Sequence, residues 1–436
     1  PNDWSLIDRF SLTKGQANTL GLVPAGSAMT VADVADNGES AVGAVTGTVY
    51  EGDTPIQQIG RWVVLKDIEA FTNDLAVAKS WDDFDASVGI YSATTKANDW
   101  WSIGNTAYHV LVPGGELLDG IACNTSAEGC DFNYDISSVG DASTLAFYAT
   151  GTWYATTDLS IDLGLRRENH EVNYSVDEDL DGVITKALQY DETKTSWTLG
   201  ANYALNDTSG VFVRMNRGYK MPYFDDFRDN WSAYTGGNDM IREVTQGELG
   251  YKFMNDSIQF FATAFANEVK GDTFVRRPGA PAEILTNEAY GIELDGRYSH
   301  DSGFSLSVNA TLQETEITAS ATNEGNEAQR QPGWQVRLTP SYDFEIADMY
   351  ATLYGTLSAV DDRFGDNENT IVLEGYEKID VGLTLEPTDS VRVQFSVDNL
   401  TDEQGITEGD PRNPAAPNGR YIMPRSMKLS VSYLYF

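Results

Sequence analysis

Residues 304–313 read Phe-Ser-Leu-Ser-Val-Asn-Ala-Thr-Leu-Gln, with an apolar side chain at every even position and a polar one at every odd position. Successive side chains of a β-strand point to opposite faces of the sheet, so the stretch predicts a strand with one apolar and one polar face. On a helix the same residues would scatter around the cylinder. The stretch therefore favours a strand that separates an apolar environment from a polar one.

The same alternation recurs along the chain, which extends the strand prediction to most of its length. Further examples are residues 159–166, 197–205, 290–298, 334–342 and 379–385. A membrane β-barrel shows this pattern because lipid-facing and lumen-facing residues alternate. We expect the apolar rows to lie on an outer wall, with Ile161, Leu306 and Leu383 exposed there and not packed in a closed core.

The connections between these segments alternate between short and long. Short turns are predicted at 80–83, 156–158, 206–210, 255–257, 300–303, 345–348 and 387–389, and long polar segments at 15–68, 112–141, 175–193, 219–240, 270–286, 317–330, 361–374 and 401–424. Tight turns at one end and large loops at the other are typical of an antiparallel barrel meander in an outer membrane. A soluble sandwich would not sort its connections in this way, and a propeller would repeat every four strands.

The prediction is an all-β, transmembrane antiparallel barrel with about sixteen strands in this chain. The expected strands are 2–13, 70–79, 84–95, 142–155, 159–174, 194–205, 210–218, 241–254, 257–269, 287–299, 303–316, 331–344, 349–360, 375–386, 390–400 and 425–436. Residues 99–111 are assigned to a loop, since each short turn then joins a descending strand to an ascending one. The last strand ends on Phe436, as the aromatic C-terminus of an outer-membrane barrel does.

The charge balance excludes one class of partner. The chain has 29 basic and 66 acidic side chains, 29 − 66 = −37. Nucleic acid needs a Lys/Arg footprint that neutralises phosphates, so no nucleic-acid partner is expected. The apolar outer wall instead implies outer-membrane lipid as a neighbour. The acidic surface itself is compatible with solvation or with divalent cations.

The two cysteines, Cys123 and Cys130, lie close together in a polar, Gly-rich stretch. In an oxidising compartment such spacing predicts a local disulfide. Two free thiols are the alternative.

Four motifs in a fixed order resemble the TonB-dependent outer-membrane receptors. Residues 212–222, Phe-Val-Arg-Met-Asn-Arg-Gly-Tyr-Lys-Met-Pro, are similar to the family's Arg-Gly-aromatic-basic-x-Pro turn, and residues 245–252 contain its Glu-Leu-Gly-x-Lys strand. Residues 289–296 match the Gly-Ile-Glu-x-Asp strand, and residues 397–402 contain the Asn-Leu-x-Asp signature. Gly405 departs from the pattern, because the family usually has a Tyr near this position.

The resemblance implies a transporter and not an enzyme. The family combines an N-terminal plug, which contacts TonB, with a barrel of about twenty-two strands. We expect residues 1–436 to be the later strands of such a barrel, with the plug absent from this chain and TonB engaged through that missing plug. No Gly-x-Ser-x-Gly or His-Glu-x-x-His motif is present, which agrees with the absence of catalysis.

Aromatic and polar residues near the expected loops are candidates for binding a small-molecule nutrient. Aromatic rings stack on sugar rings or flat chelates, while Arg and Asn supply hydrogen bonds; the same aromatics also anchor strand ends at lipid headgroups. The candidates are Trp100, Trp101, Tyr108, Arg217, Tyr219, Asn230 and Trp231, with Tyr223, Arg228 and Arg276 beside them. The run Trp-Trp-Ser-Ile-Gly-Asn at 100–105 resembles family members associated with carbohydrate uptake.

An acidic loop is a candidate metal site. Asp177, Asp179 and Asp181 are spaced as in a calcium loop, and Gly182 follows where the chain must turn. The bidentate Glu of an EF-hand is missing, since Leu188 occupies its position, so Asp191 or Glu192 would have to replace it. Calcium is therefore an expected optional ligand and no other cofactor is expected. The alternative is a solvated acidic loop.

Three functions remain open at this point. The leading one is active, TonB-dependent import of a scarce nutrient such as an oligosaccharide or ferric siderophore. A passive porin-like diffusion channel is the second, and it requires strand 2–13 to pair with strand 425–436 in a smaller closed barrel. A surface binding protein or adhesin is the third.

Overall fold

The computed structural model describes residues 4–34, 41–119, 133–274, 283–409 and 419–435. Sixteen antiparallel strands form one sheet and follow one another in chain order. They are β1 (Trp4–Thr30), β4 (Pro55–Ser80), β5 (Phe84–Val110), β7 (Asn133–Tyr154), β8 (Leu159–Glu178), β9 (Ile184–Asn206), β10 (Ser209–Lys220), β11 (Arg242–Met254), β12 (Ile258–Phe274), β13 (Glu283–Ser299), β14 (Phe304–Ala319), β15 (Trp334–Ile346), β16 (Met349–Val360), β19 (Tyr376–Thr388), β20 (Val391–Asp398) and β23 (Ser426–Tyr433).

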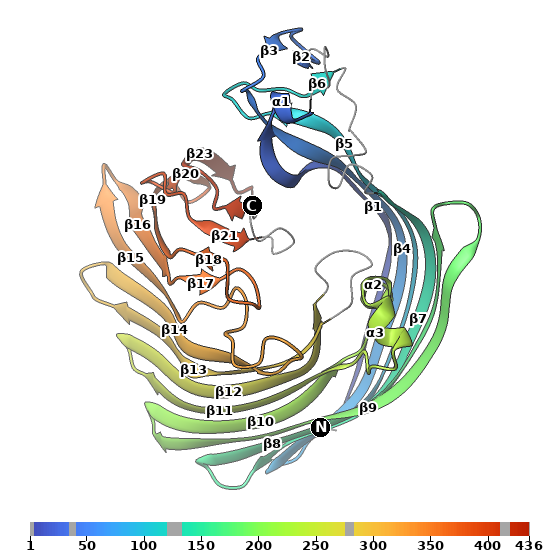
Figure 1. The fold of residues 1–436 in the computed structure, drawn as a ribbon. Coiled ribbons are helices and arrows are strands. Elements are labelled where there is room, and N and C mark those ends of the chain that lie inside the picture. Colours follow the sequence, from blue (N-terminus) through green and yellow to red (C-terminus); the bar gives the residue numbers. More distant parts are fainter. Residues whose placement is uncertain (1–3, 35–40, 120–132, 275–282, 410–418, 436) are drawn as a thin grey trace.

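Small elements lie in the connections of this sheet. The short strands are β2 (Ala41–Gly43), β3 (Val49–Tyr50), β6 (Leu118–Asp119), β17 (Arg363–Phe364), β18 (Val372–Leu373), β21 (Ile406–Gly409) and β22 (Gly419–Tyr421), and the helices are α1 (Val31–Val34), α2 (Phe224–Asp229) and α3 (Trp231–Thr235). The large sheet curves from β1 round to β23, and α2 and α3 lie on its concave side (Figure 1). The predicted all-β, antiparallel barrel architecture is confirmed.

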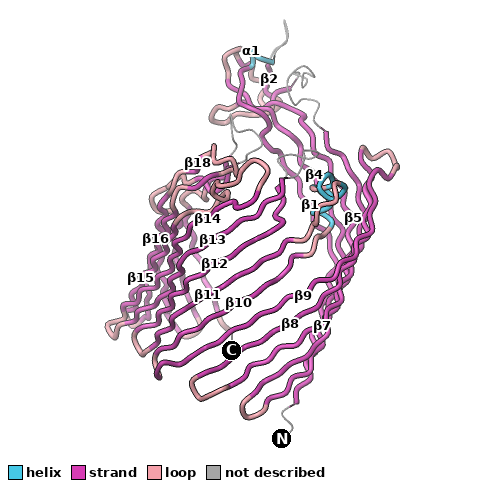
Figure 2. The backbone as a smooth tube through the Cα atoms, turned by 60° about the horizontal axis from the view of Figure 1, so that its bottom comes forward, coloured by secondary structure: helices cyan, strands magenta, loops and turns pink. Residues whose placement is uncertain are grey.

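The hairpin turns are built by local chemistry that the sequence already contains. In the turn between β11 and β12, the Asn255 side-chain oxygen accepts hydrogen bonds from the backbone N–H of Ser257 (3.0 Å) and Ile258 (2.7 Å). Between β15 and β16, Ala347 and Asp348 both have positive φ, 51° and 62°, as a two-residue type I′ hairpin requires. Figure 2 shows these turns together at one end of the sheet, here called the turn end, opposite the loop end with the longer connections.

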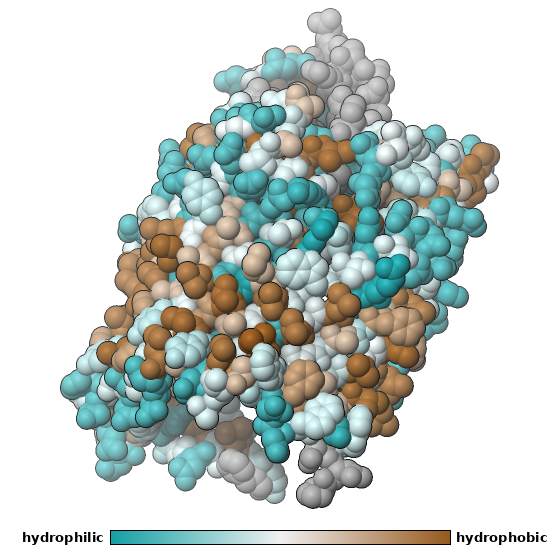
Figure 3. All heavy atoms as spheres, turned by 90° about the horizontal axis from the view of Figure 1, so that it is seen from below, coloured by the Kyte–Doolittle hydropathy of each residue, from teal (hydrophilic) through white to brown (hydrophobic). Residues whose placement is uncertain are grey.

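The apolar rows lie on the convex face, as predicted. Leu163, Leu165, Leu312 and Leu353 are each more than half exposed, while Ile161, Leu306 and Leu383 are partly exposed. Figure 3 shows hydrophobic side chains gathered in a region of the outer surface, with hydrophilic residues above and below it. An exposed apolar surface of this kind is stable in contact with lipid.

The strands extend further toward the loop end than the sequence suggested. Of residues 99–111, assigned to a loop, residues 99–110 instead form the second half of β5, which pairs with β4 and β7 as far as Val110 and Gly104 respectively. The expected strand 2–13 is likewise only the first half of β1, and the expected loop 175–193 shrinks to the hairpin 179–183. The prediction was wrong here because it stopped at the apolar residues, whereas backbone pairing continues wherever a neighbouring strand supplies a partner.

The large sheet has two edges among the described residues. Phe10 of β1 pairs with Asn73 of β4, and Leu429 of β23 pairs with Phe395 of β20. No ladder joins β1 to β23 in the described part of the chain. The closed small barrel that the porin alternative requires is therefore not formed by these strands.

Four residues discussed above lie outside the described residues: Cys123, Cys130, Arg276 and Phe436. The disulfide accordingly stays a prediction. In the described part of the chain, no helix is long and apolar enough to cross a membrane.

Candidate ligand-binding site on the inner wall

The connection between β10 and β11, residues 221–241, folds back onto the concave face of the sheet and is here called the inner segment. Met221 and Pro222 end β10, since Pro has no N–H to donate to a neighbouring strand. The Asp226 carboxylate then accepts a hydrogen bond from the Tyr223 N–H (3.0 Å), which stabilises the first turn of α2. The segment thus leaves the sheet and turns inward within a few residues.

Aromatic packing attaches the inner segment to the wall. Phe227 is fully buried and meets the ring of Tyr190 edge-on, with ring centroids 5.2 Å apart. Phe224 stacks on Tyr174 at 5.7 Å. The Phe224 ring also covers Gly140 of β7, where a Cβ would lie 2.5 Å from the ring. Because only glycine leaves that space, the wall is shaped to accept this segment.

His170 of β8 connects the wall to the start of the inner segment. Its side chain is buried, and its Nε2 lies 2.9 Å from the carbonyl oxygen of Pro222. Its Nδ1 lies 2.8 Å from the Thr144 hydroxyl. Since a carbonyl can only accept, Nε2 carries a proton and donates to the Pro222 oxygen, whereas the Thr144 hydroxyl can donate to or accept from Nδ1. Both ring nitrogens of His170 therefore have a partner.

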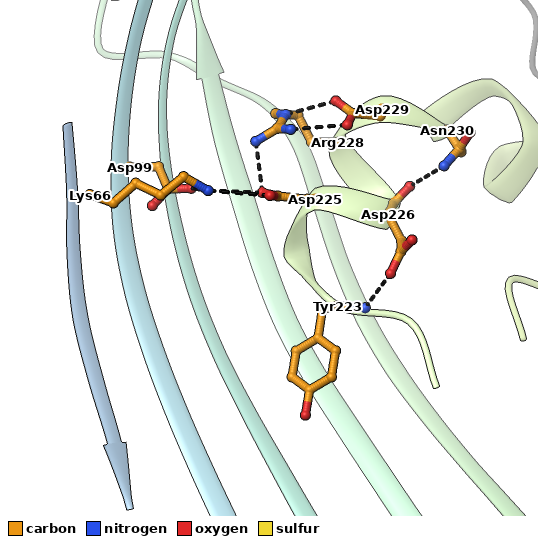
Figure 4. Close-up of polar contacts among 8 residues, drawn as sticks. All are labelled: Lys66, Asp99, Tyr223, Asp225, Asp226, Arg228, Asp229 and Asn230. Carbon is orange, nitrogen blue, oxygen red and sulfur yellow. Dashed lines mark hydrogen bonds and ion pairs between the residues drawn. The ribbon is translucent and has the colours of Figure 1, made fainter. Parts of the chain in front are cut away.

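A charged network joins the inner segment to β4 and β5 (Figure 4). Lys66 lies 3.2 Å from both Asp99 and Asp225. Arg228 pairs with Asp225 (2.7 Å) and Asp229 (2.8 Å), with only 5% of its side chain exposed. Its guanidinium lies 4.0 Å from the ring centroid of Trp101. Opposite charges surround each cation, so the network holds α2 in place.

The Arg228 charge is retained although the group is buried. Burial by itself disfavours the charged form, but the hydrogen bond and the negative charge of Asp229 outweigh it and raise the pKa of Arg228. A permanent cation over an indole face is a cation–π contact. Arg228 thus remains fixed between Trp101 and the two carboxylates.

The candidate tryptophans at 100 and 101 are divided between the two faces of β5. Trp101 points to the concave side, where it contacts Arg228 and lies 6.1 Å from Trp62. Trp100 points to the opposite face, since neighbouring side chains of a strand alternate and its partner Leu65 lies in the exposed apolar row. The structure therefore brings only Trp101 into the inner site.

Tyr108, Arg217 and Tyr219 lie elsewhere. Tyr108 is 1% exposed and packs with Ile56, Val110 and Leu118 in a small core at the loop end of β4 and β5. Arg217 and Tyr219 are neighbours on β10: Arg217 is ion-paired with Glu243 and lies 5.5 Å from the Tyr219 ring. Tyr108 is thus placed as a packing residue, whereas Arg217 and Tyr219 form part of the wall below the inner segment.

Asn230 and Trp231 both belong to the inner segment. Asn230 is buried and its Nδ2 donates to the Asp226 carbonyl (2.9 Å), while its Oδ1 has no partner among the described residues. Trp231 packs partly against the aromatic cluster, 5.6 Å from Tyr234. With Trp101 and Arg228, they gather aromatic rings and polar groups on the concave side of the sheet, where Trp101 and Trp231 are partly exposed and Asn230 and Arg228 are buried.

The acidic loop forms the hairpin between β8 and β9. Asp177 accepts a hydrogen bond from the Gly182 N–H (3.0 Å), and Asp181 accepts one from the Val183 N–H (2.8 Å). Asp179 has a φ of 67° and Gly182 one of 86°. Within the described ranges, no three His, Cys, Asp or Glu side chains are grouped so that they could hold a metal ion. Calcium binding therefore stays a prediction that would need the loop to rearrange.

Sequence reasoning missed the residues that fix the inner segment, namely Lys66, Asp99, Gly140 and His170. Each occupies an inward position of its strand, so alternation gives its direction. Lys66, Gly140 and His170 meet the inner segment at Asp225, Phe224 and Pro222, from 52 to 159 residues further along the chain, and Asp99 is linked to it only through Lys66. Nothing local identifies that partner.

Comparison with known proteins identifies a family and several relatives that are similar to this chain. A family model described as "TonB dependent receptor-like, beta-barrel" matches residues 4–400. Pesticin receptors of Yersinia enterocolitica and Yersinia pestis are each 24% identical over 319 residues, which cover 67% of this chain and 45% of the relative. The chain thus spans less than half the length of these curated relatives.

Solved structures show the same architecture. The ferric yersiniabactin uptake receptor of Yersinia pestis superposes with a TM-score of 0.68 at 17% identity, over 89% of this chain and 60% of that one. A siderophore receptor of Acinetobacter baumannii gives 0.66 at 14% identity, over 87% and 62%. A copper transporter gives 0.65 at 14% identity, over 87% and 61%. At these identities the similarity supports the fold alone.

Proposed function

This chain belongs to the family of TonB-dependent receptors, outer-membrane transport proteins of Gram-negative bacteria, and we propose that it forms the wall of an active importer for a scarce nutrient. The family has no catalytic activity, so its conserved architecture serves recognition and passage. The loop end of the sheet is then extracellular and the turn end periplasmic.

The observation that carries the proposal is the fixed inner segment. A connection that starts at the loop end is held against the lumenal wall by His170, Phe227 and Arg228, which are all buried. Trp231 of this segment stays partly exposed on the concave side of the sheet, where an entering molecule would pass, whereas Asn230 is buried. A rigid, partly aromatic surface of this kind suits ligand capture, since little ordering is needed on binding.

The energy source and the ligand are parts of the same proposal. TonB would act on a plug domain, and the nutrient would be an oligosaccharide, a ferric siderophore or a comparable small molecule. Similar proteins are described as pesticin receptors, a ferric yersiniabactin uptake receptor, a ferric citrate transporter and a copper transporter, and the three metal-related names support a small, scarce cargo. Calcium in the β8–β9 hairpin would be an accessory to such a receptor.

Passive diffusion is the second candidate. An inward-folded connection is also expected of a porin, which narrows its pore in this way. However, a porin made of these strands would need β1 to pair with β23, and the described strands do not form that ladder. The open sheet supports a larger barrel completed by further strands, because an unpaired edge is not tolerated in hydrocarbon.

Energy dependence separates the two functions. Cells that carry the full receptor gene, or a deletion of it, are given radiolabelled ferric siderophores and radiolabelled neutral oligosaccharides, with and without a protonophore. Active import predicts accumulation that needs both the receptor and the proton gradient. Entry that needs the receptor but continues unchanged with the protonophore would establish the porin function and end the import proposal.

A further inference from the structure

A second inner surface lies apart from the inner segment, at the loop end of β12, β13 and β14. Here the wall and the connections 320–333 and 361–375 enclose a cavity of about 460 Å³. This volume falls within the range of small-molecule sites. Half of its lining residues carry a carboxamide or a guanidinium: Asn267, Asn287, Gln313, Gln329, Gln331, Asn367 and Arg330.

The cavity is formed in advance by hydrogen bonds between the two connections and the wall. Asn326 donates to the carbonyl of Asn367 (2.9 Å), and Asn369 exchanges hydrogen bonds with the backbone of Glu327 (2.8 and 3.0 Å). Gln313 of β14 donates to the Pro332 carbonyl (3.1 Å). These bonds tie three separate parts of the chain together, so the cavity keeps its shape without a ligand.

Four polar atoms around the cavity have no hydrogen-bond partner among the described residues. Two are acceptors, Asn287 Oδ1 and Gln329 Oε1, and two are donors, Asn367 Nδ2 and Arg330 Nε. Asn367 is only 3% exposed, so bulk solvent reaches little of it. Buried polar groups are normally hydrogen-bonded, and unsatisfied ones call for an explanation.

A ligand in the cavity supplies that explanation. The terminal amide of Asn or Gln turns easily about its last single bond, which lets it present its oxygen or its nitrogen to the cavity. Both acceptors and donors await partners, so the ligand must offer donors and acceptors side by side. A hydroxyl group does both.

The charges at the cavity argue against an anionic ligand. Its charged lining residues are Asp272, Glu288 and Arg330, with a net charge of 1 − 2 = −1. Arg330 is already paired with Glu408 at 2.8 Å. No lining cation is therefore left to neutralise an anion, and a neutral ligand avoids this cost.

We propose that this cavity binds a neutral, hydroxyl-rich sugar unit of an oligosaccharide, held by Asn287, Gln329 and Asn367. The proposal rests on the proposed function, because it names the class of nutrient that the importer would take. It concerns a part of the wall separate from Trp101 and Arg228.

The test uses the full receptor purified in detergent and an array of short neutral oligosaccharides built from glucose, galactose, mannose or xylose, with ferric citrate as an anionic probe. The double variant Asn287→Leu/Gln329→Leu keeps the approximate size of the side chains and removes their hydrogen bonds. Gln335→Leu, a lumen-facing amide of β15 outside the cavity, is the matched control. Unchanged heat-modifiable mobility on gels shows that each variant is folded.

Saturable binding of a neutral oligosaccharide is expected, weakened about tenfold or more in the double variant and less than about twofold in the control. Three results would overturn the proposal: no neutral oligosaccharide binds, the double variant binds it as well as the parent, or the double variant loses ferric citrate alone. Receptor-dependent, energised uptake that persists in those cases would leave the import function intact. Sugar binding at the cavity without energised uptake would refute the import function and would still support the sugar-binding site.

Discussion

Arg228→Met should release the inner segment from the wall while leaving the barrel folded. Methionine keeps most of the aliphatic length of arginine but removes the charge that contacts Trp101 and pairs with Asp225 and Asp229. The local consequence is that Asp229 loses its cation, Asp225 keeps only Lys66, and the indole of Trp101 loses the guanidinium. The strands themselves lose no backbone hydrogen bond.

The magnitude follows from the exposure of each partner. A desolvated cation–π contact contributes about 2 kcal/mol, and the contact here is made by an arginine that is 95% buried. The Asp225 and Asp229 side chains are 53% and 50% exposed, so water replaces much of each pair and each contributes up to about 1 kcal/mol. The sum, about 2–4 kcal/mol, corresponds to an increase of about 30- to 1,000-fold in the opening equilibrium.

Hydrogen exchange of residues 224–235 in the detergent-solubilised receptor measures this opening. The reporters are the helical amides of Phe227, Asn230 and Tyr234, which donate to carbonyls four residues earlier. Exchange through local opening reports the opening equilibrium directly. We expect these amides to exchange faster by the factor given above, with the sheet amides unchanged.

Lys220→Met is the matched control, because it removes an exposed ion pair to Asp226 of the same helix. Such a pair contributes less than about 1 kcal/mol, so exchange should rise less than about fivefold. If Arg228→Met gives no more than this control, the charged network does not hold the segment. Faster exchange throughout the sheet would also refute the reasoning, since the effect would then be global.

Three further predictions follow from other contacts. Gly140→Val should displace Phe224 and destabilise the attached state of the inner segment by about 1–3 kcal/mol, which is measured as faster hydrogen exchange at residues 221–230. Unchanged exchange would contradict the close approach of the Phe224 ring to Gly140. Asp179→Asn should weaken calcium binding measured by calorimetry, and equal affinity in variant and parent removes that site. Hydrogen bonds from Thr46 hold the pKa of Glu116 below its ordinary value of 4.5, so their stabilising effect is present above that value and lost as the pH falls through the lowered pKa. Hydrogen exchange at residues 41–50 should therefore become faster in acid, and Glu116→Gln should abolish this pH dependence. If exchange in the variant still becomes faster in acid, a titrating group other than Glu116 is responsible.

The sequence determined the class of fold and much of its layout. The alternation at 304–313 and the Asn-Asp-Ser turn at 255–257 are local signals, because a strand's two faces and a turn's hydrogen bonds depend on neighbouring residues. The order of sixteen strands and the outward direction of rows such as Leu163 and Leu165 follow from them. The family resemblance seen in four motifs agrees with the match over residues 4–400.

Strand length was less predictable than strand existence. The alternation of apolar and polar residues ends where the wall is no longer in contact with lipid. The strand β5 nevertheless continues through residues 99–110, because its backbone forms hydrogen bonds with β4 and β7. Those bonds depend on the presence of a partner strand and not on side-chain polarity. For the same reason, the sequence placed Tyr108 in a ligand-binding loop, although it is buried against Ile56 and Leu118.

The candidate site was decided by tertiary structure. The alternation of β5 was enough to separate Trp100 from Trp101, but only the folded wall brings Trp101 to Arg228, which is 127 positions later in the sequence. Gly140 and His170 acquire their roles in the same way, from a segment that folds back over the wall as far as Lys66 of β4. A local pattern fixes the direction in which a side chain points, whereas the residue it meets depends on curvature, register and packing summed over the whole sheet.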